Sequence, residues 1–268
     1  MFTIYEAAQS VLHIQDVLGV SFSYLQGKTG GLLIDTGYGL ENVKELIDSI
    51  ADVPYQVLLS HGHHDHILGA SDFDTVFLCA EDLDEYHLRS GKEQRKKITD
   101  RAIQAGIKVP GNYLTRKMPE PLRLVFNDQT AGLESIRFDL GGVSAVVIHV
   151  PGHTPGSLMV WIPERKILFS GDNWNPCTWL WFPSSLGTRQ WKRNMQRILG
   201  LPFETVFCSH QPEGFRKQCM EEYMNWLTDD VLKNAPETDT DGSGIQVRKA
   251  CWPEKGYEYV FDYGKIWL

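Results

Sequence analysis

The sequence predicts an α/β fold, built from strand-and-helix units that occur in both halves of a 268-residue chain. Short runs of apolar and β-branched residues alternate with segments whose apolar residues recur at helical spacing, which favours this fold class. Several of the short runs end directly at histidine or aspartate residues, as expected where rigid strand ends carry a functional site. Since this alternation of strands and helices is similar in both halves, we expect a duplicated layout, although the sequence shows no clear repeat.

In the first half, strands are predicted over residues 22–25, 31–34, 57–59 and 76–79. Helical spacing of apolar residues predicts a helix through Val43, Leu46, Ile47 and Ile50. Residues 81–105 are polar and are also predicted to be helical. They form part of an expected helical insert at about 81–121, within a single domain that covers residues 1–268.

In the second half, strands are predicted over residues 143–150 and 205–208, with a hairpin of residues 158–162 and 166–169. Two helices are predicted from the spacing of their apolar residues, one through Trp191, Met195, Ile198 and Leu199, the other through Phe215, Cys219, Tyr223 and Leu227. A final hairpin is expected from residues 245–252 and 257–263.

Composition excludes several classes of protein. The formal net charge of −8 argues against broad nucleic-acid binding, which normally needs a basic face. We therefore do not expect a nucleic-acid partner. No apolar run reaches the length of about 20 residues that crosses a bilayer, and the N-terminus has no secretory signal pattern. The five cysteines are odd in number and form no Cys-x-x-Cys pair, which favours reduced thiols in a cytoplasmic enzyme.

The most informative motif is His-x-His-x-Asp-His, formed by His61, His63, Asp65 and His66 after the strand at 57–59. These side chains cannot share one face of a helix or strand, so a tight loop at a strand end is expected. Imidazole nitrogens together with a carboxylate suit a borderline divalent metal, zinc first, with iron or manganese as alternatives. His153, Asp172 and His210 each follow a later predicted strand, and Asp35 follows an earlier one.

In this order, the motifs from residue 31 to residue 210 resemble the metallo-β-lactamase-fold superfamily of hydrolases. The resemblance implies a four-layer αβ/βα sandwich with a dinuclear metal site at one edge of two facing sheets. It implies that one metal is held by His61, His63 and His153, that the other is held by Asp65, His66 and His210, and that Asp172 bridges both. Dedicated β-lactamases of this fold generally lack the bridging aspartate. Asp172 therefore makes the chain more similar to glyoxalase II, lactonases, thioesterases and the phosphodiesterase branch.

The expected chemistry follows from two metals about 3.5–4 Å apart that share a hydroxide. The hydroxide forms at neutral pH because metal binding lowers the pKa of water to roughly 7. This bridging hydroxide would attack a carboxylic thioester, ester or lactone. Asp65 and Asp172 are the expected catalytic carboxylates, Asp65 by orienting the hydroxide and moving its proton. The alternatives are a phosphodiesterase with the same metal pair, and a non-catalytic sensor or effector that keeps the metal site.

Other residues have a structural alternative. Asp35 is expected to support the metal loop through hydrogen bonds. Trp174, Trp179, Trp181 and Phe182 follow Asp172 and are expected to line a small-molecule pocket, with a homodimer interface as the alternative. The basic insert either is a solvated helix face or attracts an anionic substrate. His13, His64, His87 and His149 are interpreted as structural or surface histidines.

Overall fold

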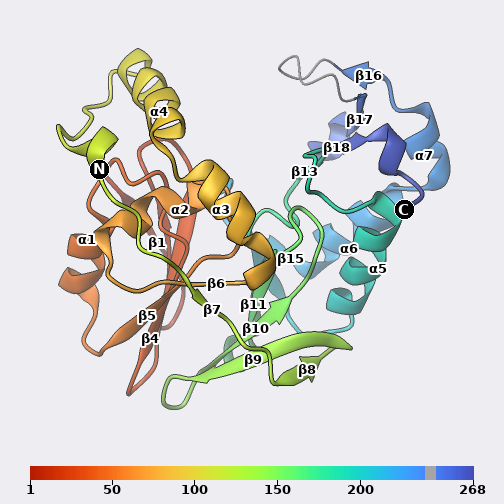
Figure 1. Ribbon diagram of the computed structural model, residues 1–268. Coiled ribbons are helices and arrows are strands. Elements are labelled where there is room, and N and C mark those ends of the chain that lie inside the picture. The colour runs from red at the N-terminus through yellow and green to blue at the C-terminus, as the bar shows by residue number, and fades with distance from the viewer. Residues whose placement is uncertain (239–245) are drawn as a thin grey trace.

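Two seven-stranded sheets lie at the centre of the computed structural model, which describes residues 1–238 and 246–268 (Figure 1). The first sheet has its strands in chain order: β1 (Thr3–Ala8), β2 (Val11–Gln15), β3 (Ser21–Gln26), β4 (Gly31–Ile34), β5 (Tyr55–Leu58), β6 (Phe77–Leu78) and β7 (Leu122–Arg123). Strands β1 to β4 pair antiparallel, and β4 to β7 pair parallel. Neither β1 nor β2 was predicted.

The second sheet repeats this arrangement. Its strands are β8 (Asp128–Thr130), β9 (Leu133–Asp139), β10 (Ser144–His149), β11 (Leu158–Ile162), β12 (Ile167–Phe169), β14 (Thr205–Phe207) and β15 (Phe215–Arg216), in the order β15-β14-β12-β11-β10-β9-β8. Strands β8 to β12 pair antiparallel, and β12 then pairs parallel with β14. A parallel pair needs a crossover, which is made through a helix in both sheets. The duplicated layout that the sequence predicts is therefore present.

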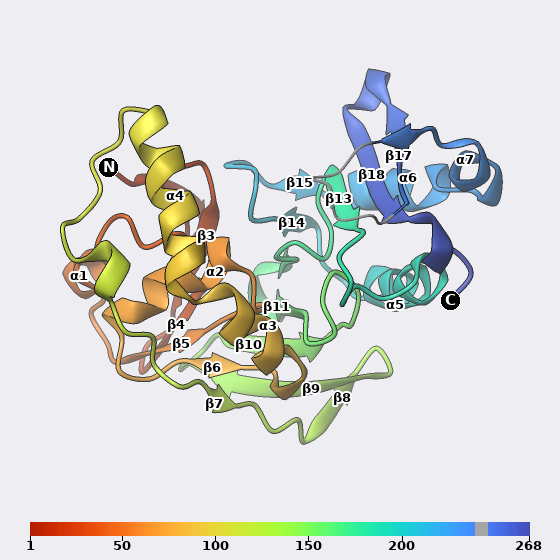
Figure 2. The same cartoon turned by 45° about the horizontal axis from the view of Figure 1, so that its top comes forward.

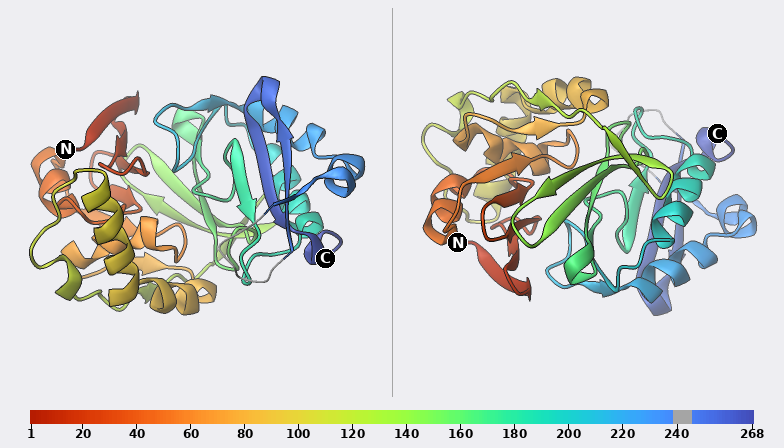
Figure 3. Two further views of the ribbon diagram at one scale, coloured as in Figure 1. Left: turned by 90° about the horizontal axis from the view of Figure 1, so that it is seen from above. Right: turned by 90° about the horizontal axis from the view of Figure 1, so that it is seen from below.

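Helices cover the outer face of each sheet (Figures 2 and 3). Helices α1 (Val43–Ile50), α2 (His64–Ile67), α3 (Leu83–Arg89) and α4 (Lys92–Gln104) lie on the side of the first sheet, and α5 (Thr188–Leu199), α6 (Lys217–Trp226) and α7 (Asp229–Asn234) on the side of the second. A third sheet with the order β13-β18-β17-β16 packs beside α5 and α6, and its strands are β13 (Cys177–Leu180), β16 (Glu237–Thr238), β17 (Val247–Trp252) and β18 (Tyr257–Asp262). The predicted C-terminal hairpin is formed by β17 and β18, whereas Ile245, at its predicted start, lies outside the described residues.

Three hydrophobic clusters separate four layers. Alternate side chains of a strand point to opposite faces of a sheet, and neighbours in the sequence accordingly belong to different clusters. Leu32 and Val147 belong to the cluster between the two sheets. Leu33 packs in the cluster beneath the first set of helices, and Val146 packs with Trp191 of α5 beneath the second. The predicted four-layer αβ/βα sandwich is thus confirmed. Over the described ranges, none of the helices has both the length and the apolar character needed to span a membrane.

His13 connects the two halves of the sandwich. It is buried in β2, where its Nδ1 lies 2.8 Å from Ser23 Oγ and its Nε2 lies 3.0 Å from the carbonyl oxygen of Gln211. Burial lowers the pKa of His13 from 6.5 to about 4, against the effect of hydrogen bonds to the backbone of Gln211 and Cys208. This histidine is therefore structural and neutral in the fold.

This burial predicts an acid-sensitive contribution to stability. The unfolded chain protonates His13 near pH 6.5 and the folded chain only near pH 4. The contribution is therefore complete above pH 6.5 and is lost as the pH falls to about 4. We expect the loss to be about 2 kcal/mol at pH 5. Urea unfolding of metal-free wild type and His13→Gln at pH 7.5 and 5 measures it. An equal pH dependence in both proteins would contradict the prediction.

Candidate metal centre

Polar loops from both sheets converge at one edge of the sandwich. His61 and His63 follow β5, His153 follows β10, Asp172 follows β12 and His210 follows β14. Two backbone hydrogen bonds join the halves there, from Leu158 N to Ser60 O at 2.8 Å and from Ser21 N to Ser209 O at 2.6 Å. The first motif begins as the tight loop that was predicted, but from His64 it continues as one turn of helix, α2.

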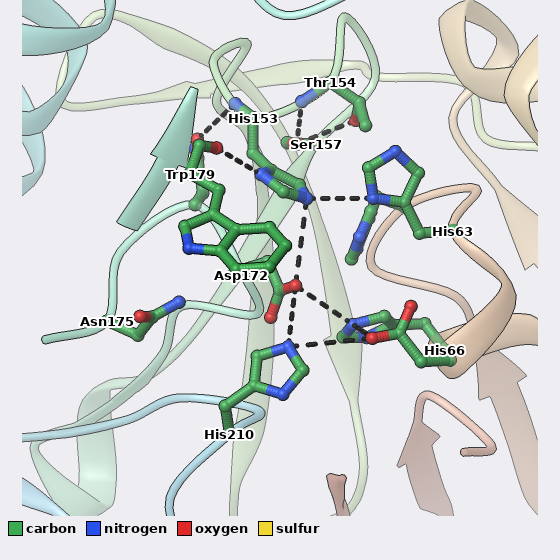
Figure 4. A network of polar contacts seen from close by, with 12 residues as sticks. His63, His66, His153, Thr154, Ser157, Asp172, Asn175, Trp179 and His210 are labelled. Carbon is green, nitrogen blue, oxygen red and sulfur yellow. Dashed lines mark hydrogen bonds and ion pairs between the residues drawn. The ribbon is translucent and has the colours of Figure 1, made fainter. Parts of the chain in front are cut away.

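The seven predicted ligands form two groups, and the potential ligand atoms within each group lie within 4.8 Å of one another. Figure 4 labels five of the seven: His63, His66, His153, Asp172 and His210. The first group comprises His61, His63 and His153, and the second comprises Asp65, His66, Asp172 and His210. Asp172 Oδ2 lies 2.9 Å from His210 Nε2, 3.4 Å from His66 Nε2 and 3.7 Å from His153 Nε2. This one oxygen therefore lies next to members of both groups.

The donor atoms fit metal ions. Within the described chain, the buried atoms His61 Nε2, His66 Nε2 and Asp172 Oδ1 have no hydrogen-bond partner. A buried polar atom without a partner is costly, and a coordinated cation would satisfy it. Nitrogen and carboxylate donors suit zinc, iron or manganese. We infer that the residues present fit a pair of divalent ions.

The electrostatics of the two groups agree with this inference. Burial lowers the pKa of His61 and His63 well below the ordinary value, and neighbouring imidazoles lower it further. These rings are therefore neutral, the form that binds a metal. For His66, burial opposes the charge, but the carboxylates of Asp172 and Asp65 outweigh it and raise the pKa. The second group thus favours a positive charge, which a divalent cation provides.

Asp35 stabilises the loop that carries His61 and His63. Its Oδ1 accepts a hydrogen bond from Ser60 N at 2.6 Å, and its Oδ2 accepts one from Ser60 Oγ at 2.7 Å and lies 2.9 Å from His66 Nδ1. The Ser60 hydroxyl in turn lies 3.1 Å from His61 Nδ1. Asp35 has a left-handed φ of 66°, which aspartate tolerates better than most residues. A carboxylate that holds the outer nitrogen of a ligating imidazole fixes its tautomer and orientation.

His153 is held by backbone and amide groups. Its Nδ1 donates to the carbonyl oxygen of Trp179 at 2.7 Å, which leaves Nε2 to face the cluster (Figure 4). Its backbone N–H donates to Asn173 Oδ1 at 2.9 Å, and Asn173 Nδ2 donates to Val150 O at 2.6 Å. Asn173 is a positioning residue that the sequence did not identify, although it directly follows Asp172.

Asp82 is a second residue that was missed. It is fully buried at the start of α3 and connects both metal loops. Its Oδ2 accepts from Gly62 N at 2.8 Å and from Thr154 Oγ1 at 2.7 Å, and its Oδ1 accepts from Gly156 N at 2.6 Å. The hydrogen bonds from Gly62 and Gly156 to Asp82 require glycine at both positions. A Cβ on Gly62 would lie only 2.6 Å from Tyr86 N, and a Cβ on Gly156 would lie only 2.8 Å from Asp82.

Glu85, also on α3, faces His63. Its Oε2 lies 3.6 Å from His63 Nε2, while His63 Nδ1 lies 2.9 Å from His153 Nε2. The same Oε2 accepts a hydrogen bond from Arg89 Nε at 3.1 Å. The sequence assigned Arg89 to a basic insert, but no local signal indicated that Glu85 would meet the metal loop.

A cavity of about 500 Å³ opens onto the two ligand groups. Trp179, Trp181 and Phe182 line this cavity, and its lining also includes Tyr38, His64, Arg89 and Arg101. The prediction that Trp174 lines this pocket is wrong. Trp174 is fully buried in the core beneath the second set of helices, where its ring packs against Phe215 and Tyr223.

Two further histidines lie near the centre. His149, in β10, places its Nε2 2.9 Å from Pro155 O and stacks its ring on Phe126, so it supports the loop that carries His153. His64 is half-buried beside the ring of Tyr38 and belongs to neither ligand group.

The position of His64 predicts a contrast with His63. His63→Ala should weaken metal binding by more than the roughly 10–100-fold loss that follows removal of an outer-shell partner. His64→Ala should weaken it by less than about 10-fold. Competition for zinc against a chelator of known affinity compares the two variants. Equal losses would show that His64 is a ligand and that the division of the motif is wrong.

Comparison with known proteins supports the same family. Residues 16–210 match the model of the metallo-beta-lactamase superfamily. An uncharacterized protein of Mycobacterium tuberculosis is 28% identical over 150 residues, which are 54% of this chain and 62% of that protein. Acyl-coenzyme A thioesterase MBLAC2 of Bos taurus is 27% identical over 164 residues, 55% of this chain and 56% of the relative. The chain thus matches little more than half the length of these curated relatives.

A shorter match is found with hydroxyacylglutathione hydrolase of Methylococcus capsulatus, which is 39% identical over 77 residues, 28% of this chain and 29% of the relative. Among solved structures, a metallo-beta-lactamase from Pontibacter korlensis aligns with a TM-score of 0.59 and 18% identity, over 85% of this chain and all of that one. TTHA1623 in a di-iron-bound form aligns with a TM-score of 0.53 and 24% identity, over 76% of this chain and 92% of that one. At these identities the structures show the fold.

Proposed function

This chain belongs to the metallo-beta-lactamase superfamily, and we propose that it is a metal-dependent hydrolase of a small thioester, ester or lactone. The observation that carries the proposal is the convergence of seven histidine and aspartate side chains in two groups, five of which line a cavity of about 500 Å³. The side chains come from the ends of four strands in two sheets. A concave pocket with convergent polar groups is the usual form of a small-molecule site.

We propose two divalent ions as the cofactor, zinc first, with iron or manganese as alternatives. Bound there, such ions supply a water of lowered pKa and an electrophile that polarises the substrate oxygen. His61, His63 and His153 would hold one ion, and Asp65, His66 and His210 the other. Asp172 would bridge them, because its Oδ2 lies beside His66, His153 and His210.

The protein supplies proton transfer and an apolar wall. Asp65 lines the cavity, and its Oδ2 lies 3.7 Å from both His66 Nε2 and His210 Nε2. Burial raises the pKa of Asp65, but His66 and His210 outweigh it, so the carboxylate is ionised. It is positioned to accept a proton at Oδ2 and to return it to the leaving group. Trp179 and Phe182 give the cavity an aromatic surface, against which an acyl or thiol moiety would pack.

Carbonyl substrates are favoured by two relatives, one named an acyl-coenzyme A thioesterase and the other a hydroxyacylglutathione hydrolase. A second candidate, a phosphodiesterase, is favoured by the two arginines at the cavity, Arg89 and Arg101. Hydrolysis of a carbonyl substrate and hydrolysis of a phosphodiester would use the same arrangement of ligands, so a comparison of substrates is needed to distinguish the two candidates.

The test is hydrolysis by protein loaded separately with zinc, iron and manganese. The panel contains an acyl thioester, an aryl ester, a lactone and a bis-aryl phosphodiester, with Asp172→Ala as the control. Turnover of a carbonyl substrate that is lost in the control supports the proposal. Turnover of the phosphodiester alone supports the second candidate. No turnover of any substrate by protein with both metals bound would favour a sensor or effector instead.

A further inference from the structure

The basic insert contributes only part of its charge to the cavity. Of the seven cationic residues between 89 and 108, Lys92, Lys96, Lys97 and Lys108 are exposed and do not line the cavity. Arg95 is buried, where it donates to Leu68 O and packs over the ring of Tyr113. Arg89 and Arg101 line the cavity that contains the ligand groups.

Arg101 is held in place by Tyr38. Its Nη1 donates to the Tyr38 hydroxyl at 2.9 Å, and its guanidinium carbon lies 5.5 Å from the centre of the Tyr38 ring. Within residues 1–238 and 246–268, the Arg101 side chain makes no ion pair with a carboxylate and no other hydrogen bond. Its remaining N–H groups are therefore available on a guanidinium that is exposed and is oriented by Tyr38.

Arg89 approaches the same space from α3. Its Nε donates to Glu85, and its guanidinium carbon lies 5.4 Å from the centre of the Phe182 ring. Neither terminal nitrogen makes a hydrogen bond to any part of the protein that the structure describes. The Phe182 ring in turn lies 4.6 Å from that of His63, and the Tyr38 ring lies 5.9 Å from that of His64. Each arginine is therefore one aromatic ring away from the metal loop.

We propose that Arg101 and Arg89 form an anion subsite, which binds a carboxylate or phosphate carried by the substrate a few bonds from the scissile carbonyl. This inference rests on the proposed hydrolase function and narrows its substrates to small acyl compounds with a second, anionic group. Guanidinium groups suit such anions because their N–H donors form two parallel hydrogen bonds with carboxylate or phosphate oxygens. Glu85 binds Arg89 through Nε alone, and Asp65, which lines the same cavity, belongs to the ligand cluster.

Matched substrates test the subsite. The S-phenyl monothioester of glutaric acid carries a free carboxylate, its methyl ester is neutral, and S-phenyl 4-phosphonobutanethioate carries a phosphonate instead. We expect wild type to prefer the anionic compounds. In Arg101→Gln, the ratio of kcat/KM for an anionic over the neutral substrate should fall about tenfold or more. The two anionic compounds show whether carboxylate or phosphate is preferred.

Controls separate charge from position. Lys97→Gln, an exposed change on the same helix, should leave the ratio unchanged, and Arg101→Lys should lower it less than Arg101→Gln because the charge remains. Arg89→Gln should also lower the ratio. Its metal content is measured in parallel, because Arg89 contacts Glu85, which faces His63. An unchanged ratio in both arginine variants would overturn the subsite while leaving the hydrolase proposal intact.

A binding measurement that needs no turnover distinguishes failure of the anion subsite from failure of the hydrolase proposal. The anilide of glutaric acid replaces the thioester by an amide, and its binding is followed by the fluorescence of Trp179 and Trp181 at the cavity. We expect the affinity to fall about tenfold in Arg101→Gln and to stay constant in Lys97→Gln. If no thioester is hydrolysed but this difference is found, the hydrolase proposal fails and the subsite stands. Equal affinity in wild type and Arg101→Gln would overturn the subsite.

Discussion

Asp172→Ala is expected to leave the protein folded but unable to retain two metal ions. In wild type, Asp172 Oδ2 lies within 3.7 Å of His66, His153 and His210, so it carries negative charge to both ligand groups. Without Asp172, both ligand groups lose a negative charge that would offset the positive charge of the metal ions. The affinity for the second ion should fall by more than the roughly 10–100-fold typical of an outer-shell change, and hydrolysis should fall at least as far.

Metal content after dialysis, measured by mass spectrometry, checks this expectation. Asp172→Asn separates charge from shape, because it keeps the volume and should still lose the ion. Asp74→Ala is a matched control, since Asp74 is exposed and lies outside both ligand groups. Full occupancy of both ions in Asp172→Ala would show that Asp172 does not bridge them.

Asp82→Ala is expected to have the largest effect on stability. The substitution leaves the backbone N–H groups of Gly62 and Gly156 without their acceptor in a buried region. It also removes one partner of the Thr154 hydroxyl, which keeps Ser157 Oγ at 2.8 Å. Each unsatisfied buried donor costs about 1–3 kcal/mol, so we expect a loss of about 3–5 kcal/mol and a fall in Tm of about 10 °C. Metal affinity should also fall about 10–100-fold, because the loops that carry His63 and His153 lose their common acceptor.

Urea unfolding of metal-free protein and competition for zinc with a chelator measure the two effects separately. Asp84→Ala removes an exposed carboxylate from the same helix and should change neither. Thr154→Val removes one of the three hydrogen bonds and should give an intermediate loss. A destabilised Asp82→Ala protein with unchanged zinc affinity would mean that Asp82 maintains the fold but does not position the ligands.

The gathering of the seven candidate ligands was predictable because its signals are local. Each ligand follows the end of an apolar run, and chemistry alone suggests a metal for His61, His63, Asp65 and His66. The fold class was accessible for the same reason. Strand β1 was missed because Ile4 is its only large aliphatic residue, so the sequence shows no apolar run there. In the structure Ile4 is exposed.

The supporting groups were not predictable because their partners are distant in the sequence. Asp82 meets Gly62 of its own half and Gly156 of the other half, and Asn173 meets His153 from another loop. The error at Trp174 has a related cause. After a strand ends, the direction of the next side chains is set by the turn, and here it places Trp174 in the core and Trp179 at the cavity.

The division of the ligands between the two sheets also bears on how the protein acquires its metal. His61, His63, Asp65 and His66 lie within six residues, so the unfolded chain already holds a short chelating segment. His153, Asp172 and His210 join it only after long loops have closed, which is slow compared with local encounters. A metal ion that meets the chain early therefore binds an incomplete set of donors and stabilises the unfolded state. This topology therefore favours folding first and metal binding second.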